Sequence, residues 1–413
     1  MDTNNNRVIV IGGGASGLFI SNILLEKGFS VLLIEKKHQA GLKLRITGKG
    51  RCNLTNTCLR EEYLKHISSP RFFEFAFDTF DNKALCSFFK NRGLGLVEER
   101  GGRVFPESGK SLDVFLNLLN PLEENPKAEI IKNCQAEHII VRNKTAIGVS
   151  TSEGDFYARH IVLATGGMTY PSTGATGDGY YMAEELGHTV VRPLPVLVGL
   201  RTKDGYPGEL QDFLVKNCEV SVINKSGLIK AKLFGDIYLD KYGVSGPVIL
   251  TLSRVIAEDL DRGETLFLKI DFKPRLSEEK LLAEIRSVFA QRRTEEVSSV
   301  LRKWFAKQML KDVLVKCGLN PKMMAKNLKE EDFKSILWYL KQRKQRIIGD
   351  MGWKEAIITK GGISLDEVDS RTMKSKKIKN LSFCGEVLDL DADTGGYNLQ
   401  IAFSTAFLAA AGL

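Results

Sequence analysis

The sequence lacks closely spaced cysteines. Its seven cysteines are odd in number and lie six or more residues apart, so they indicate neither a disulfide framework nor the paired spacing of a zinc site. The five histidines show no metal-ligand spacing either. We therefore expect reduced thiols, no bound metal and a cytoplasmic protein.

Long hydrophobic runs are also absent. No apolar run reaches the roughly 18 residues that a membrane-spanning helix needs. The first six residues are polar and show no sign of a secretory leader. The apolar stretch 401–413 is short and is typical of a buried helix, so we expect no membrane partner.

The positive charge is confined to one stretch. The chain has 413 residues, 43% of them hydrophobic, which predicts two or three compact units. Its formal net charge is +9, and segment 301–346 alone holds 13 basic and 4 acidic residues. The remainder of the chain is therefore neutral overall.

The first 35 residues predict a β-α-β unit. Residues 7–11 form a continuous apolar run, as in a parallel strand buried on both faces. A helical segment follows over 16–27, Gly28 ends it, and residues 29–35 read as the next buried strand.

The remaining sequence predicts an interrupted first domain. Strand-like segments continue to residue 164, the pattern changes near residue 193, and residues 277–346 have helical periodicity. We predict a first domain of residues 1–190 and 356–413. A β insert (191–274 and 347–355) and a basic helical insert (275–346) interrupt it.

A glycine motif lies between the first predicted strand and helix. Gly12, Gly14 and Gly17, with Ala15 and Ser16 between them, fit the G-x-G-x-x-G fingerprint of dinucleotide binding. Gly12 permits a tight turn, Gly14 lets a pyrophosphate approach the backbone, and Gly17 allows close packing of helix on strand. The helix N-terminus offers N–H groups and partial positive charge to the phosphates.

An acidic residue completes this motif. Glu35 ends the second predicted strand, with Lys36 beside it, 21 residues after Gly14. A carboxylate there accepts hydrogen bonds from a ribose 2′-OH and repels a 2′-phosphate. The ligand expected at this motif is NAD or FAD, not NADP.

Two later segments favour FAD. Strand 161–164, ending in Thr165 and Gly166, and segment 381–386, ending in Gly385 and Glu386, resemble the second and third cofactor motifs of glutathione-reductase-type flavoproteins. The resemblance implies that Glu386 holds the ribityl and pyrophosphate region of the cofactor. No Cys or His lies in an attachment motif, so we expect non-covalent FAD.

A closer resemblance covers most of the chain. Segments 41–56, 102–106, 164–179, 243–247 and 385–400 resemble the signatures of the BaiN-like NAD(P)/FAD-dependent oxidoreductases, also called the aminoacetone oxidase family. The resemblance implies an α/β fold. Its Rossmann-like FAD-binding domain, of the two-dinucleotide-fold class, would be interrupted by a β-barrel insert and a small helical insert.

The resemblance also implies a set of site residues. Arg51, Cys52 and Asn53 would lie beside the flavin, and Asn398, Leu399 and Gln400 would close over its ring system. For Cys52 two roles stay open, a proton donor to substrate or a small buried residue packing under the flavin. The full cofactor-binding set is Gly12, Gly14, Ala15, Ser16, Gly17, Glu35, Lys36, Lys43, Gly50, Arg51, Cys52, Asn53, Ala136, Thr165, Gly166, Gly385, Glu386, Asn398, Leu399 and Gln400.

Several functions remain open at this stage. No second G-x-G-x-x-G appears, so NAD(P)H is expected only as a transient co-substrate. The first hypothesis is reduction of a carbon–carbon double bond in a small molecule, or oxidation of a small amine. The second is reduction of uridine to dihydrouridine in ribosomal RNA, bound through 301–346.

Segment 301–346 also has a plainer interpretation. Its cations and its aromatic residues Trp304, Phe305, Trp338 and Tyr339 suit a polyanion with unpaired bases. The alternative, which we favour, is a solvated helical face with its aromatics in the core. A third hypothesis is an FAD-binding interaction protein without turnover. The substrate, the choice between NADH and NADPH, and the oligomeric state stay open.

Overall fold

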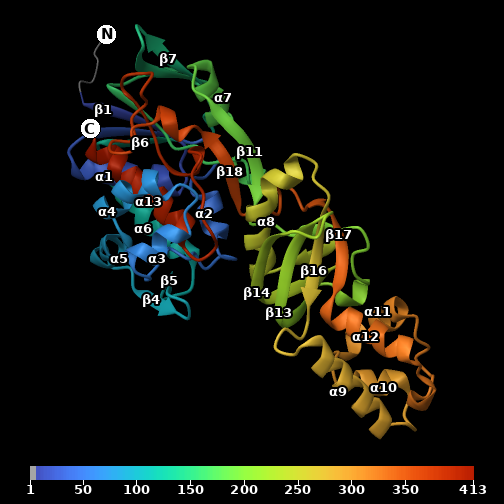
Figure 1. The fold of residues 1–413 in the computed structure, drawn as a ribbon. Coiled ribbons are helices and arrows are strands. Elements are labelled where there is room, and N and C mark those ends of the chain that lie inside the picture. The colour runs from blue at the N-terminus through green and yellow to red at the C-terminus, as the bar shows by residue number, and fades with distance from the viewer. Residues whose placement is uncertain (1–5) are drawn as a thin grey trace. The chain divides into compact units, whose positions relative to one another are not determined.

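The chain forms two compact units in the computed structural model, which describes residues 6–413 (Figure 1). Unit 1 comprises Met1–Pro195 and Trp353–Leu413, and unit 2 comprises Val196–Gly352. The prediction that the first six residues show no secretory leader concerns mostly residues 1–5, which lie outside the described part. Unit 2 contains the predicted helical insert and most of the predicted β insert, whose residues 191–195 and 353–355 belong to unit 1. The separation of the two inserts into two domains stays a prediction.

A parallel five-stranded sheet forms the centre of unit 1. Its order is β19 (Leu381–Phe383), β10 (His160–Leu163), β1 (Arg7–Ile11), β2 (Ser30–Ile34) and β6 (Ala128–Ile131). The chain runs outward from β1 to β6 and then returns to the other side of β1 with β10. This reversal is the switch point of a doubly wound Rossmann sheet, where ligands bind outside the carboxyl ends of the strands.

Helices α1 (Ala15–Glu26) and α13 (Tyr397–Ala411) pack on the sheet and on each other. In α1 every residue from Ser16 to Leu24 is buried, because the helix lies in the centre of the core. The centre of the Phe19 ring lies 4.7 Å from the centre of the Phe88 ring and 5.0 Å from that of the Phe403 ring. Across residues 6–413, no helix has both the length and the apolarity needed to cross a bilayer.

Smaller elements complete unit 1. β7, β8 and β9 form one antiparallel sheet, β3, β5 and β4 form a second, and β11 pairs with β18. The bounds are α2 (Leu42–Ile46), β3 (Thr55–Asn56), α3 (Arg60–Lys65), α4 (Pro70–Thr79), α5 (Asn82–Asn91), β4 (Leu96–Glu99), β5 (Arg103–Pro106), α6 (Ser111–Glu123), β7 (Ala136–Arg142), β8 (Thr145–Thr151), β9 (Gly154–Tyr157), α7 (Asp178–Glu185), β11 (Val190–Val196) and β18 (Ile358–Ile363).

Unit 2 is a closed barrel with attached helices. The barrel order is β12-β15-β14-β13-β16-β17, which confirms the predicted Rossmann-like α/β class with an inserted β-barrel. The bounds are β12 (Leu200–Thr202), β13 (Phe213–Asn224), β14 (Ile229–Asp240), β15 (Gly243–Ser245), α8 (Pro247–Asp261), β16 (Leu266–Asp271), α9 (Glu278–Gln291), α10 (Val297–Leu301), α11 (Leu310–Cys317), α12 (Glu330–Lys341) and β17 (Arg343–Asp350).

The end of the predicted helical insert is a strand. Helical periodicity was expected through residue 346, but β17 begins at Arg343. Alternate residues of β17, namely Arg343, Gln345 and Ile347, are buried. The pattern is that of a strand, but two of its three buried residues are polar, so hydrophobicity alone did not reveal it.

Those buried polar residues belong to a cluster in unit 2. Arg343, 2% exposed, donates to the Asp312 carboxylate and to the Tyr339 hydroxyl. The Arg343 guanidinium lies 4.5 Å from the centre of the Tyr206 ring, and Tyr206 donates to Gln345 Oε1 at 3.0 Å. The cluster therefore pairs a buried cation with a buried anion.

The buried His160 on β10 makes stability depend on pH. Burial lowers the pKa of His160 to about 3, from 6.5, so the folded state holds it neutral while the unfolded chain binds a proton near pH 6.5. Its stabilising contribution is complete above pH 6.5 and is lost as pH falls toward 3, by up to about 1.4 kcal/mol per pH unit. Urea unfolding at pH 6.5 and 5.5 should show a shallower pH dependence for His160→Asn.

The exposed His38→Asn serves as the matched control for this experiment. It should keep the pH slope of the parent protein. Identical slopes for His160→Asn and the parent would contradict this account of His160.

Candidate functional site

In the turn after β1, Gly12 and Gly17 are closely packed, and Gly14 between them borders open space. A Cβ on Gly12, whose φ is +102°, would lie 2.6 Å from the Ala164 carbonyl oxygen, and a Cβ on Gly17 would lie 1.8 Å from the Gly12 carbonyl oxygen. Gly14 has an ordinary φ of −82°, and a Cβ there would meet no described atom within 4 Å. Gly12 and Gly17 are thus needed for packing, whereas Gly14 faces open space.

Helix α1 begins at this open space without a cap. Gly14 is the N-cap residue, no side chain caps the helix, and its first turn carries no acidic residue. The first N–H groups of a helix have no acceptor within the helix, and the helix dipole adds partial positive charge there. The start of α1 is therefore suited to bind an anionic group.

The three predicted motifs meet at this edge of the sheet. Thr165 and Gly166 follow β10, and Gly385 follows β19. A Cβ on Gly12 would lie 2.9 Å from Thr165 Cα, and one on Gly385 would lie 2.1 Å from Ser16 Oγ. Segments about 150 and 370 residues after the glycine motif are therefore in contact with it.

Glu35 lies at the end of β2 and faces the same turn. Its carboxylate accepts hydrogen bonds from Gly13 N at 2.9 Å and from Lys37 N at 2.8 Å. Burial raises the pKa of Glu35, while these two hydrogen bonds and the nearby Lys36 and Lys37 act in the opposite direction. The side chain of Lys36 pairs with Asp178 at 2.7 Å instead of pointing at the glycine turn.

The strand that contains Ala136 begins beside this end of β2. Ala136 is the first residue of β7 and is buried. Two residues earlier, Cys134 N donates to the Glu35 carbonyl oxygen at 3.1 Å. Ala136 is therefore close in sequence to the segment that contacts Glu35.

Two predicted site residues have buried polar atoms without a hydrogen-bond partner. These atoms are Thr165 Oγ1 and Asn53 Oδ1, which find no partner within the described part of the chain. Such atoms are rare in folded proteins and call for a ligand, a water molecule or an ion as hydrogen-bond partner. Together with the open space at Gly14 and the uncapped helix, they fit a bound dinucleotide such as FAD.

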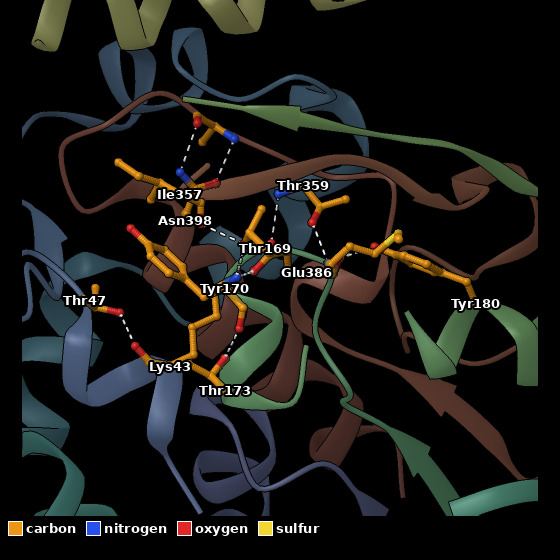
Figure 2. Close-up of polar contacts among 12 residues, drawn as sticks. Lys43, Thr47, Thr169, Tyr170, Thr173, Tyr180, Ile357, Thr359, Glu386 and Asn398 are labelled. Atoms are coloured by element: carbon orange, nitrogen blue, oxygen red, sulfur yellow. Dashed lines mark hydrogen bonds and ion pairs between the residues drawn. The ribbon is translucent and has the colours of Figure 1, made fainter. Parts of the chain in front are cut away.

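Glu386 is the centre of a polar network that joins four segments of unit 1. Its carboxylate pairs with Lys43 Nζ at 2.6 Å and accepts from Thr359 N at 2.9 Å, and Lys43 also donates to Thr169 Oγ1 at 2.6 Å. Figure 2 shows these contacts as dashed lines. A Cβ on Gly167 would lie 2.2 Å from Thr359 Oγ1, so glycine is required there. The sequence did not indicate Thr169 in the loop after β10 or Thr359 within β18, because an isolated threonine belongs to no recognisable motif.

The loop after α2 has an unusual backbone. Gly48, Lys49, Gly50 and Cys52 have φ values of +61°, +58°, +84° and +60°, and non-glycine residues in this region are strained. Ser111 N donates to the Gly50 carbonyl oxygen at 2.8 Å and holds the loop to α6. Such strain often occurs at binding sites.

The two charged or reactive side chains of this loop differ in exposure. Cys52 has no exposed surface, and burial raises the pKa of its thiol to about 12, so the thiol is protonated at neutral pH. Arg51 is 46% exposed, pairs with Glu99 and lies 4.4 Å from the centre of the Phe105 ring. The burial of Cys52 favours the packing role, and its role as a proton donor stays a prediction.

The three predicted residues at the start of α13 contact the protein itself. Asn398 donates to the carbonyl oxygens of Ala392 and Asp393 and accepts from Ala392 N. Gln400 is fully buried, donates to the Phe80 carbonyl oxygen at 3.0 Å, and accepts from a threonine hydroxyl. Leu399 packs against the core. Their proposed contact with a flavin ring stays a prediction.

No metal site accompanies these residues in the described structure. Across residues 6–413, no three His, Cys, Asp or Glu side chains are grouped so that they could hold a metal ion. All seven cysteines are free.

The parallel sheet and its glycine turn define a Rossmann-fold protein. The chain belongs to the family described as HI0933-like protein Rossmann domain, whose model matches residues 6–412. This confirms the resemblance predicted from the sequence motifs, and the curated relatives agree with it.

Two curated relatives match over nearly the whole chain. The 3-dehydro-bile acid delta(4,6)-reductase of Clostridium scindens is 28% identical over 98% of both chains. The ribosomal RNA dihydrouridine synthase of Escherichia coli is 28% identical over 97% of this chain and 96% of its own. Among solved structures, the Mycobacterium smegmatis Sdh1 complex in the apo form has a TM-score of 0.51 at 14% identity, covering 100% of this chain and 68% of that one. This last similarity shows a shared fold only.

Proposed function

We propose that the chain binds FAD non-covalently at the carboxyl ends of β1, β10 and β19. The observation that carries this proposal is the open space before Gly14 at the uncapped start of α1. A pyrophosphate needs close approach to the backbone and N–H donors, and both are present there.

Each neighbouring residue has a role in this proposal. The first N–H groups of α1 hold the pyrophosphate, and Glu35 accepts from the ribose. Thr165 Oγ1 and Asn53 Oδ1, which lack partners within residues 6–413, are available to the remainder of the ligand. When bound, FAD supplies hydride-transfer chemistry. Glu386 and its network orient the loops around the ligand.

We further propose that the chain is a reductase that takes hydride from NAD(P)H and delivers it to a carbon–carbon double bond of a small molecule. The printed name of the C. scindens relative supports this reaction type, and the match extends over 98% of both chains. We expect this reaction in the cytoplasm.

A second candidate acceptor is uridine in ribosomal RNA. Its support is the exposed basic surface of segment 301–346, where 11 of the 13 basic side chains are exposed, together with the name of the E. coli relative. The aromatic part of this hypothesis has less support, because Phe305 and Tyr339 are buried and Trp304 stacks on Phe289. Trp338 is 39% exposed and remains available for stacking.

The experiment that tests these proposals is anaerobic. The FAD-loaded protein is reduced with NADH or NADPH, and its reoxidation is followed by absorbance with a steroid enone or with unmodified ribosomal RNA. We expect reoxidation by the enone to be faster than in the buffer control. Reoxidation by RNA, with dihydrouridine in the product, would replace the small-molecule acceptor with uridine. Absence of reduction by either nicotinamide would contradict the reductase proposal and favour an FAD-binding interaction protein.

A further inference from the structure

A row of basic side chains crosses the outer face of the barrel in unit 2. In the strand register, Ser221 on β13 is opposite Lys232 on β14 and also opposite Lys269 on β16, and Lys269 is opposite Lys344 on β17. Residues directly opposite each other in antiparallel strands project from the same face. Three lysines and one serine therefore lie side by side across four strands.

This arrangement is unfavourable unless an anion compensates it, because like charges directly opposite each other destabilise a sheet. Lys232 is compensated by Glu219, at 2.7 Å. Asp271 is already paired with Lys341, at 2.6 Å. Among the described residues, neither Lys269 nor Lys344 has a carboxylate within ion-pair distance.

The row borders a hollow of the size that ligands occupy. A cavity of about 650 Å³ lies beside β13 and β16, within the range of small-molecule sites. Ser221, Lys232 and Lys269 line it from the strands, and Arg275 lines it from the loop before α9. Arg275 is exposed and has no ion pair in the described part of the chain.

The acidic residues of the hollow are already engaged. Glu219 pairs with Lys232 and Asp271 with Lys341, while Glu278 accepts from Gln342 Nε2 at 2.6 Å. Lys269 and Arg275 are then the two cations left to bind an anion. An aromatic ring borders the lysine row, since Lys344 Nζ is 4.1 Å from the centre of the Phe267 ring, and Phe267 is two residues before Lys269 on β16.

We propose that this hollow is a phosphate-binding groove, with Lys269 and Arg275 as its phosphate ligands. The phosphate comes either from the backbone of single-stranded RNA or from a small phosphorylated molecule. The groove lies in unit 2 and uses none of the cofactor motifs of unit 1, so it does not depend on the proposed reductase activity.

The test is a double variant, Lys269→Gln/Arg275→Gln, in the full chain. Binding of a short fluorescein-labelled single-stranded RNA is measured by anisotropy at several salt concentrations without an electron donor. If RNA is the source, its affinity falls about tenfold or more. The slope of log K against log salt becomes shallower by about 1.4, because each lost phosphate contact on a single strand contributes about 0.7.

A matched control removes two charges elsewhere in unit 2. Lys203→Gln/Lys216→Gln changes two exposed lysines outside the groove and should leave RNA binding unchanged. In the second arm, binding of inorganic pyrophosphate is measured by calorimetry. If the groove variant loses pyrophosphate binding but keeps RNA binding, the ligand is a small phosphorylated molecule. Equal binding of both probes by variant and parent would overturn the proposal.

Stability separates binding from a structural role. Because Lys269→Gln removes repulsion with Lys344, its Tm without ligand should equal or exceed that of the parent. A lower Tm would mark Lys269 as part of the fold and would also overturn the proposal. Because no electron donor is used, failure here is distinct from failure of the reductase proposal.

Discussion

The Gly14→Val variant should fold normally and lose FAD. A Cβ on Gly14 would meet no described atom within 4 Å, and the backbone there has an ordinary φ, so we expect the fold to tolerate valine. The same side chain fills the space that a pyrophosphate requires above the start of α1. In a fluorescence titration of the apoprotein, we expect the Kd for FAD to rise at least about 100-fold, which is a loss of about 2.7 kcal/mol of binding free energy. The Tm should stay within a few degrees of that of the parent.

Gly208 provides a matched control. It too lacks a positive φ, and a Cβ there would meet nothing within 4 Å in residues 6–413, but it lies in unit 2. Gly208→Val should keep the FAD affinity of the parent. Unchanged FAD binding by Gly14→Val would show that the pyrophosphate lies elsewhere.

The Arg343→Met variant should strongly destabilise unit 2. Removing the guanidinium leaves the buried Asp312 carboxylate and the Tyr339 hydroxyl without their cation. Breaking a buried ion pair from one side costs about 3–5 kcal/mol. Urea unfolding followed by tryptophan fluorescence should show this loss.

Two further variants define the cause of that loss. Arg346→Met changes an exposed residue of the same strand and should cost less than about 0.5 kcal/mol. The double variant Arg343→Met/Asp312→Leu removes both charges and should recover part of the lost stability. A loss of less than about 1 kcal/mol for Arg343→Met alone would contradict the ion-pair account.

The β-α-β unit around the first motif could be predicted because its signals are local. An apolar run, three glycines at fixed spacing and Glu35 lie within 35 residues. Their arrangement follows from parallel strands that end at one edge of a sheet. The later motifs at Thr165 and Gly385 could be added because they also follow short buried strands.

Long-range polar contacts could not be predicted in this way. The partners of Glu386 come from α2, the loop after β10 and β18, and no periodicity links these segments. The hydrogen bonds of Asn398 and Gln400 to the protein could not be predicted either, because they depend on how α13 packs on other segments. Strand β17 was missed because buried Arg343 and Gln345 interrupt the hydrophobic alternation.

The most direct test of the central claim is to identify the cofactor itself. The protein is purified, loaded with FAD if needed, desalted and denatured with acid, and the released material is separated by chromatography. We predict FAD in the supernatant at about one per chain, with no flavin left on the protein, as expected for non-covalent binding. Failure to retain FAD after loading, or retention of FMN in its place, would contradict the account.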